Sequence, residues 1–249
     1  MNIMIFDTET TARDFCYNVG YIIINTDTGE QLIARDFVVE QVWHNLPLFS
    51  TAYYAEKRPI YVNAMRSRKA TLDKFGYICQ TMIRDIKAFN VSSAYAYNSP
   101  FDDKIFSINT DWYKCANPFD NIPIFDIRGY AMHYIVNDDY KAFCDKNNFY
   151  TDSGNYSTTA ENMYRFLTKN VDFIEDHTAL SDSKIEWQIL HAALDRGAIL
   201  ETNYSIDFKK IAKKRTNTLI IKVNRQTVAI FLYNKKINKN DVVYLTYED

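Results

Sequence analysis

Short apolar runs bounded by polar turns dominate the beginning of the chain. Residues Met1 to Phe6 are mainly apolar and stop at a group of acids and threonines, which is the pattern of a buried strand that ends at a polar edge. Two further strand-like runs, Tyr17 to Asn25 and Gln31 to Glu40, are joined by the turn sequence Thr26-Asp27-Thr28-Gly29. The pattern predicts a β-hairpin beside the first strand.

Alternating helices and strands follow. Apolar residues between about Ser67 and Phe89 recur at the spacing of one helical face. Two more strands are predicted at Ser92 to Tyr97 and at Ile122 to Asp126, and each runs into a helix, one from Phe101 and one near Tyr130. Strands that alternate with helices indicate an α/β fold, and the early hairpin makes its sheet mixed.

Two later helices carry recognisable end signals. Thr158 and Glu161 have the spacing of a capping box for a helix through Leu167. Asp182 to Arg196 is predicted as a helix with Gly197 as its C-cap. Its apolar face consists of Ile185, Ile189, Leu190 and Ala193.

The pattern changes after Gly197. A basic stretch from Phe208 to Arg215 precedes three strand-like runs, at Thr218 to Val223, Thr227 to Tyr233 and Val242 to Tyr247. We therefore expect a main domain over residues 1–200, followed by a basic segment and a small three-stranded antiparallel β appendage over residues 201–249.

Composition narrows the class of protein. The 249 residues are 47% hydrophobic and 24% charged, which excludes wholesale disorder. The 29 basic and 31 acidic residues leave a net charge of −2, which argues against a polycationic nucleic-acid coat but not against a nuclease with a local basic groove. The chain has 19 Tyr and 16 Phe, whose codons are rich in A and T, but only 6 Gly and 5 Pro, whose codons are rich in G and C. From this codon bias we infer an AT-rich bacterial or phage genome.

Targeting and cysteine signals favour the cytoplasm. The apolar runs are far shorter than the ~20 residues that span a bilayer, and Met1 to Thr10 does not have the pattern of a signal peptide. The four cysteines are widely separated without a CxxC pair, so neither a zinc site nor a disulfide scaffold is indicated. We expect a cytoplasmic protein with no membrane partner.

Three polar segments carry the candidate chemistry. Asp7 and Glu9 lie two apart on a strand, so they project to the same side and form half of a site for a hard divalent cation. Asp102 begins a helix, and Asp182 opens another five residues after His177. Each signal alone fits a structural role, namely a polar strand edge, an acid favoured by the helix dipole, and an N-cap beside a loop histidine.

Together, the segments FDTETT, NSPFD and HTALSD resemble the three motifs of the DEDDh family of 3′–5′ exonucleases. That family includes the proofreading subunits of bacterial replicative polymerases, ribonuclease T and oligoribonuclease. The resemblance covers roughly residues 1–197. It implies a ribonuclease H-like fold, with a mixed five-stranded sheet flanked by helices, and makes residues 1–200 the exonuclease domain.

The resemblance also implies a site. Asp7, Glu9, Asp102 and Asp182 would bind two Mg²⁺ or Mn²⁺ ions, which activate water and stabilise the leaving oxygen in phosphodiester hydrolysis. His177 would be the general base, and the product a nucleoside 5′-monophosphate. Contacts to the terminal nucleotide are expected from Thr8, Thr10, Thr11, Asn98 and Phe101.

Some features remain open in the sequence. Many relatives carry glycine where this chain has Ala12, so the loop from Ala12 to Asn18 is expected to differ in shape. The acids Glu175 and Asp176 are expected to raise the pKa of His177. Phe101 fits a buried aromatic behind the motif better than a base-stacking residue. The lysines near residue 210 fit either phosphate contacts or a solvated helix face.

The leading hypothesis is a stand-alone, metal-dependent 3′–5′ exonuclease that acts on the 3′ ends of single-stranded DNA or RNA. A polymerase partner would act in trans. Two alternatives remain: a phosphodiesterase of small signalling oligonucleotides, and an exonuclease-like docking subunit of a polymerase or host-factor complex.

Overall fold

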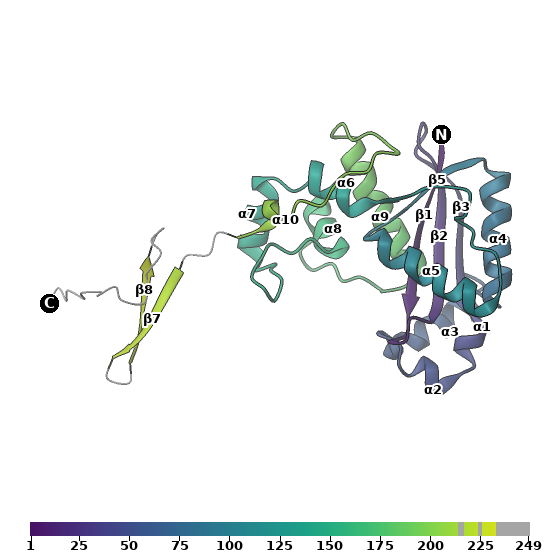
Figure 1. Cartoon of the computed structure of the whole chain (residues 1–249), viewed down its shortest axis with the longest axis horizontal. Helices are drawn as coiled ribbons and strands as arrows, with labels where there is room; N and C mark the ends of the chain where they lie inside the picture. Colours follow the sequence, from purple (N-terminus) through teal and green to yellow (C-terminus); the bar gives the residue numbers. More distant parts are fainter. Residues whose placement is uncertain (214–216, 224–225, 233–249) are drawn as a thin grey trace. The chain divides into compact units, whose positions relative to one another are not determined.

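The computed structural model describes residues 1–213, together with the backbone of residues 217–223 and 226–232. Two compact units are present, residues 1–211 and 212–249. A mixed sheet with strand order β4-β3-β2-β1-β5-β6 forms the centre of the first unit (Figure 1). Its strands are β1 (Asn2–Thr10), β2 (Cys16–Asn25), β3 (Glu30–Val39), β4 (Thr71–Asp73), β5 (Val91–Ala96) and β6 (Ile124–Asp126).

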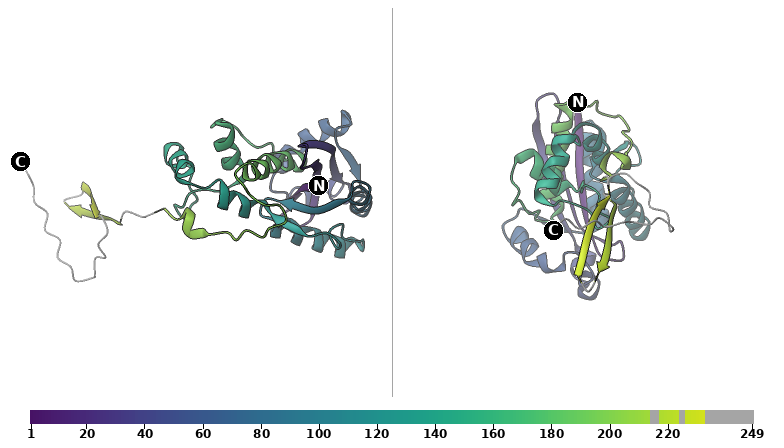
Figure 2. Two further views of the ribbon diagram at one scale, coloured as in Figure 1. Left: turned by 90° about the horizontal axis from the view of Figure 1, so that it is seen from above. Right: turned by 90° about the vertical axis from the view of Figure 1, so that its left-hand side faces the viewer.

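Helices cover both faces of this sheet (Figures 1 and 2). One face packs against the helices that precede β6, namely α1 (Glu40–Trp43), α2 (Leu46–Phe49), α3 (Arg58–Arg66), α4 (Phe75–Ala88) and α5 (Ser99–Tyr113). The 3₁₀ turn η1 (Ala55–Lys57) leads into α3. The other face packs against α6 (Ile127–Tyr134), α7 (Asp138–Asn147), α8 (Ala160–Thr168), α9 (Ala179–Leu194) and α10 (Phe208–Ile211).

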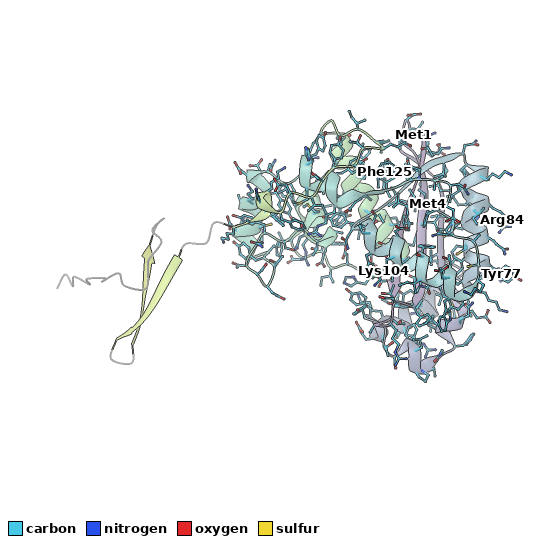
Figure 3. The ribbon with its side chains drawn as sticks, in the orientation of Figure 1. Met1, Met4, Tyr77, Arg84, Lys104 and Phe125 are labelled. Carbon is cyan, nitrogen blue, oxygen red and sulfur yellow. The ribbon has the colours of Figure 1, made fainter. Side chains whose placement is uncertain are left out.

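Side-chain alternation along β1 assigns its residues to the two layers. Met4 and Phe6 pack in the core with α4 and α5, and Met4 is labelled there in Figure 3. Ile3 and Ile5 pack in the core with α9. Because neighbouring residues of a strand face opposite ways, Asp7 and Glu9 continue the second series and face the α9 layer.

The sheet differs from the expected one by a sixth strand. β4 pairs in parallel with the end of β3, from Phe37 to Val39, and this pairing holds Thr71–Asp73 extended. The helix expected from about Ser67 therefore begins only at Phe75. A three-residue edge strand carries no apolar run of its own, which explains why the sequence pattern did not separate it from the helix. Helices α1, α2, α3 and α7 were likewise not expected.

Two helix starts also differ from expectation. The N-cap of α8 is Thr159, whose hydroxyl accepts the N–H of Asn162, rather than Thr158. The N-cap of α9 is Thr178, so the helix begins at Ala179, and Asp182 lies within its first turn instead of opening it. The C-cap of α9 is Asp195, so the prediction of Gly197 as the C-cap is wrong; Gly197 follows two residues later with φ of +92°.

The described part of the C-terminal unit is a two-stranded antiparallel ribbon. β7 (Asn217–Val223) pairs with β8 (Gln226–Leu232), which confirms the first two predicted strands. The third, Val242 to Tyr247, lies outside the described residues. In the described part of the chain, no helix is both long enough and apolar enough to cross a membrane.

Helix α9 approaches β2 at a glycine. A Cβ atom on Gly20 would lie 2.0 Å from the backbone N of Leu180 and 2.2 Å from the backbone C of Ala179. Backbone atoms cannot move aside as a flexible side chain can, so only glycine fits here. This contact sets the position of the first turn of α9 on the sheet.

We expect Gly20→Ala to lower the free energy of unfolding by about 3 kcal/mol or more, because it overpacks backbone against backbone. Gly76→Ala is the control, since its new Cβ would meet only Cys115 Cβ at 3.5 Å and would stabilise α4 by up to about 1 kcal/mol. Urea unfolding of both variants measures the difference. Equal stabilities would contradict the close approach.

Candidate active site

The candidate site lies where β1 extends beyond its parallel neighbour. β1 pairs with β5 only from Asn2 to Ile5. The last residues of β1, which include Asp7 and Glu9, therefore continue past the end of β5. The carboxyl ends of parallel strands are a common location for ligand sites in α/β proteins.

Asp102 reaches this strand end from α5. Its side chain is 2% exposed, and its Oδ1 accepts hydrogen bonds from the N–H and the Oγ1–H of Thr8, at 3.1 and 2.6 Å. The turn before α5 is fixed by Asp126, whose Oδ1 accepts the N–H of Asn98 at 2.8 Å. The residue between Asp7 and Glu9 thus connects β1 directly to the third acid.

Asp182 reaches the same place from α9. Asn18 and Gly20 lie opposite Glu9 and Asp7 in the register of β1 and β2. Asn18 Oδ1 accepts the N–H of Ala179 at 2.8 Å, which satisfies an otherwise unpaired donor of the first helical turn. The two β2 residues that face the first acid pair therefore also hold the start of α9.

A compact ligand group results. Glu9, His177 and Asp182 each offer a ligand atom, and these atoms all lie within 4.8 Å of one another. Asp7 and Asp102 adjoin them, because Asp7 shares a strand face with Glu9 and Asp102 binds Thr8, which lies between the two. The structure thus brings together all five residues that the motifs pointed to, from β1, α5, α9 and the loop before α9.

Burial and mutual repulsion both act on these acids. Burial raises the pKa of Asp102 and of Asp182 to about 7 each. Burial, followed by the charges of Asp182 and Asp102, raises the pKa of Glu9 to about 9. For Asp7, burial and the charges of Asp102 and other acids raise the pKa well above its ordinary value. Four carboxylates so arranged strongly favour binding protons or cations.

Sequence reasoning missed a further acid, Glu186. It lies one helical turn after Asp182 and is 3% exposed, and its Oε2 has no hydrogen-bond partner. Burial and then the charges of Asp102 and Asp182 raise its pKa. The spacing of four residues places it on the same helix face as Asp182, which was the available signal.

His177 lies beside the acids in a left-handed conformation, with φ of 49°. Burial and then the charge of Lys57 lower its pKa, so the expected rise is wrong. Lys57 donates hydrogen bonds to the backbone carbonyls of Glu175 and Asp176, at 3.2 and 2.9 Å. Desolvation and this ammonium group outweigh the nearby acids, whose effect is smaller. A neutral imidazole near pH 7 follows.

The expected substrate contacts occupy different environments. The Thr8 hydroxyl binds Asp102, and Thr10 is buried at 3% exposure. The Thr11 hydroxyl is fully buried and accepts the N–H of Phe15. Asn98 is exposed in a left-handed conformation. Phe101 is 37% exposed, so the expectation of a buried aromatic behind the motif is wrong.

Contacts with α5 shape the loop after β1. Asp14 is left-handed, with φ of 61°. Its carboxylate pairs with Lys104 at 2.8 Å, and its carbonyl accepts a hydrogen bond from Asn109. Lys104 is labelled in Figure 3.

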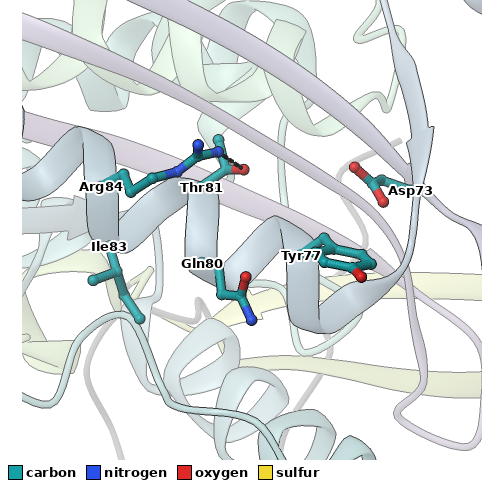
Figure 4. Close-up of a pocket in the computed structure, with 6 residues that line it drawn as sticks. All are labelled: Asp73, Tyr77, Gln80, Thr81, Ile83 and Arg84. Carbon is teal, nitrogen blue, oxygen red and sulfur yellow. Dashed lines mark hydrogen bonds between the residues drawn. The ribbon is translucent and has the colours of Figure 1, made fainter.

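A separate hollow lies on the outer face of α4 (Figure 4). Arg84 there donates a hydrogen bond to Thr81 Oγ1 at 2.8 Å, and Asp73 is the one carboxylate among its lining residues. This hollow lacks the paired acids that the strand end provides. The chemistry therefore points to the strand end.

Comparison with known proteins supports the fold. The nuclease domain of 3′hExo, a DEDDh family member whose structure was determined bound to rAMP, resembles this chain with a TM-score of 0.50. The two share 14% sequence identity over 79% of this chain and 92% of that one. The chain therefore has the same mixed α/β fold as that nuclease domain. No family model and no curated protein sequence matches it.

The buried acids at the end of β1 suit divalent metal ions. Asp182 Oδ1 and Glu186 Oε2 are buried without a hydrogen-bond partner, which is costly unless a proton or a cation compensates them. Carboxylate oxygens are the preferred ligands of Mg²⁺ and also suit Mn²⁺. The donor set therefore fits the ions that the motifs imply.

We expect the metal-free protein to lose stability as the pH rises. Asp102, Asp182 and Glu9 have raised pKa values in the folded state, so this state holds protons that the unfolded chain releases from about pH 4. Their stabilising contribution is fully present at low pH and disappears as the pH passes 7 and then 9. A loss of about 2 kcal/mol corresponds to roughly 4–8 °C in the melting temperature.

Thermal melts from pH 5 to pH 9 in a chelator would measure this loss, and parallel melts with Mg²⁺ should recover it. An alkaline decline that Mg²⁺ leaves unchanged would contradict metal binding by these acids.

We expect Glu186→Gln to raise the melting temperature of the metal-free protein at pH 8, because it removes one carboxylate from a repelling group. The substitution should also reduce the stabilisation that Mn²⁺ provides. Asp195→Asn is a matched control, since Asp195 follows the same helix with its side chain 64% exposed. If both variants melt alike with and without Mn²⁺, Glu186 does not belong to the electrostatic group.

Proposed function

We propose that this protein is a metal-dependent 3′–5′ exonuclease that hydrolyses single-stranded DNA or RNA to nucleoside 5′-monophosphates. The observation that carries the proposal is the convergence of Asp7, Glu9, Asp102 and Asp182 at one strand end with His177 beside them. The DEDDh fold supports it. In the solved relative, rAMP is the bound molecule, which agrees with a nucleotide product.

The four carboxylates would hold two Mg²⁺ or Mn²⁺ ions. Such ions supply charge for the attacking and leaving oxygens of an in-line displacement. Thr8 keeps the Asp102 carboxylate at the end of β1 through two hydrogen bonds. Glu186 adds negative charge to the same place, and we propose that it assists cation binding.

His177 would act as the general base. Its lowered pKa leaves the imidazole neutral near pH 7, so a ring nitrogen can accept a proton from the attacking water. The ring lies close to Glu9 and Asp182, next to the expected reaction centre. This proximity supports the proposed role of His177 as the base.

The terminal nucleotide would lie along the end of β1 and the start of α5. We propose that Thr8, Thr10, Thr11 and Asn98 shape this pocket through their backbone and polar groups. Phe101 would stack on a base, since its ring is exposed beside the buried Asp102. We also propose that the protein acts in the cytoplasm and that a polymerase partner would act in trans.

A docking subunit without catalysis is less well supported. Buried carboxylates that repel one another cost stability, and a surface used only for docking gains nothing from them. A phosphodiesterase of small signalling oligonucleotides would use the same acids and base. Substrate length therefore distinguishes this second candidate from the first.

We expect stepwise shortening of 5′-labelled single-stranded DNA or RNA from the 3′ end in Mg²⁺ or Mn²⁺. Asp102→Asn should reduce the rate by more than the roughly 100-fold typical for loss of an outer-shell partner of a metal ligand. A chelator should abolish the reaction. The faster of the two product ladders identifies the preferred polymer.

The matched control is Asp103→Asn, because Asp103 is exposed next to buried Asp102. Cleavage of short oligonucleotides alone would favour the phosphodiesterase. An absence of cleavage in a folded protein that binds Mn²⁺ would overturn the exonuclease proposal.

A further inference from the structure

The loop that carries His177 is held by side chains from a distant segment. Residues 171–178 between α8 and α9 contain no helix or strand. Three side chains contact this loop: Tyr54, which lies just before η1, Lys57 at the end of η1, and Tyr61 in α3. They precede it by more than 110 residues.

Tyr54 covers the imidazole itself. The two rings are parallel within 7°, with centroids 4.0 Å apart. Stacking of two aromatic rings restricts rotation of the ring. Tyr54 therefore bears on the orientation of His177 and not only on the path of the loop.

Lys57 and Tyr61 hold the backbone on both sides of that ring. Lys57 binds the carbonyls of Glu175 and Asp176, and the Tyr61 hydroxyl donates to the His177 carbonyl at 3.2 Å. Tyr61 is itself fully buried in the core. Three consecutive carbonyls of an irregular loop thus accept hydrogen bonds from the segment formed by η1 and α3.

Such support is needed because His177 has an unfavourable backbone conformation. A non-glycine residue with φ of 49° has a strained backbone, which persists where its surroundings enforce it. The contacts from Tyr54, Lys57 and Tyr61 provide that enforcement. Without them, the loop could relax and carry the imidazole away from Glu9 and Asp182.

We propose that Tyr54, Lys57 and Tyr61 are positioning residues that hold the His177 imidazole against the acidic site. The inference rests on the proposed function for its catalytic consequence, whereas the orientation of the ring can be tested without activity. Tyr54 acts through stacking, so its hydroxyl is dispensable. The ring of Tyr54 is required.

The test compares Tyr54→Leu with Tyr54→Phe. The leucine variant should lower kcat between about 10- and 100-fold, the range for loss of an outer-shell partner, and leave KM nearly unchanged. The phenylalanine variant should retain activity, because it keeps the stacked ring. Tyr53→Leu is the matched control, because Tyr53 is the neighbouring residue in the chain and is 64% exposed.

Proton NMR of the histidine ring resonances gives an independent readout. A stacked ring shifts the protons above its face upfield, so Tyr54→Leu should move the His177 Hε1 signal downfield, and Tyr54→Phe should not. His177→Gln identifies the signal among those of the four histidines. If Tyr54→Leu leaves both the resonance and kcat unchanged, the positioning role is overturned.

The two readouts separate this inference from the proposed function. A wild-type protein without nuclease activity would overturn the exonuclease proposal. The NMR comparison would still decide whether Tyr54 orients His177. A third variant, Lys57→Met, should disturb the same resonance through the loop backbone, and an unchanged signal would exclude Lys57 from the positioning group.

Discussion

The contact between α9 and β2 determines where the acidic residues meet. Asn18 and Gly20 bring the first turn of α9 onto the sheet, one by accepting a backbone hydrogen bond and the other by leaving room for backbone atoms. Both lie opposite an acid of β1 in the strand register. This close approach brings Asp182 of α9 near Glu9 of β1. A bulkier residue at position 20 would separate the two halves of the site.

The cost of this arrangement explains much of the surrounding structure. Asp7, Glu9, Asp102 and Asp182 are drawn together although burial and repulsion raise their pKa values. Hydrogen bonds compensate only part of this cost, since Thr8 satisfies one oxygen of Asp102 while an oxygen of Asp182 has no partner. Packing of the hydrophobic core on both faces of the sheet offsets the unfavourable free energy of bringing these acids together. Cation binding is the chemical use that such a strained group of acids suits best.

The main sheet and the five motif residues were accessible from the sequence for a physical reason. Buried strands have contiguous apolar runs, and Asp7, Glu9 and Asp102 lie at or just after the ends of two of them. Asp182 lies instead in the first turn of a helix, and it was found through its motif with His177. The edge strand β4 and the helices α1, α2 and α3 lack such patterns and depend on tertiary pairing, as Thr71–Asp73 does with the end of β3. Glu186 was missed because its importance arises only when α9 lies on the sheet.

The pKa of His177 shows how chain neighbours mislead. Glu175 and Asp176 precede it directly, and their charges predict a rise. In the fold, burial lowers the pKa of His177, and Lys57 donates hydrogen bonds to the backbone carbonyls of both acids. Burial is the larger cause of the lowered pKa of His177, and the charge of Lys57, which is 119 positions from Asp176 in sequence, acts in the same direction. The sequence shows which charges lie beside a group along the chain. The direction of its pKa shift also depends on desolvation and on charged residues that the fold brings near it. The neutral imidazole of His177 at pH 7 thus follows from its burial and from the ammonium group of Lys57 together.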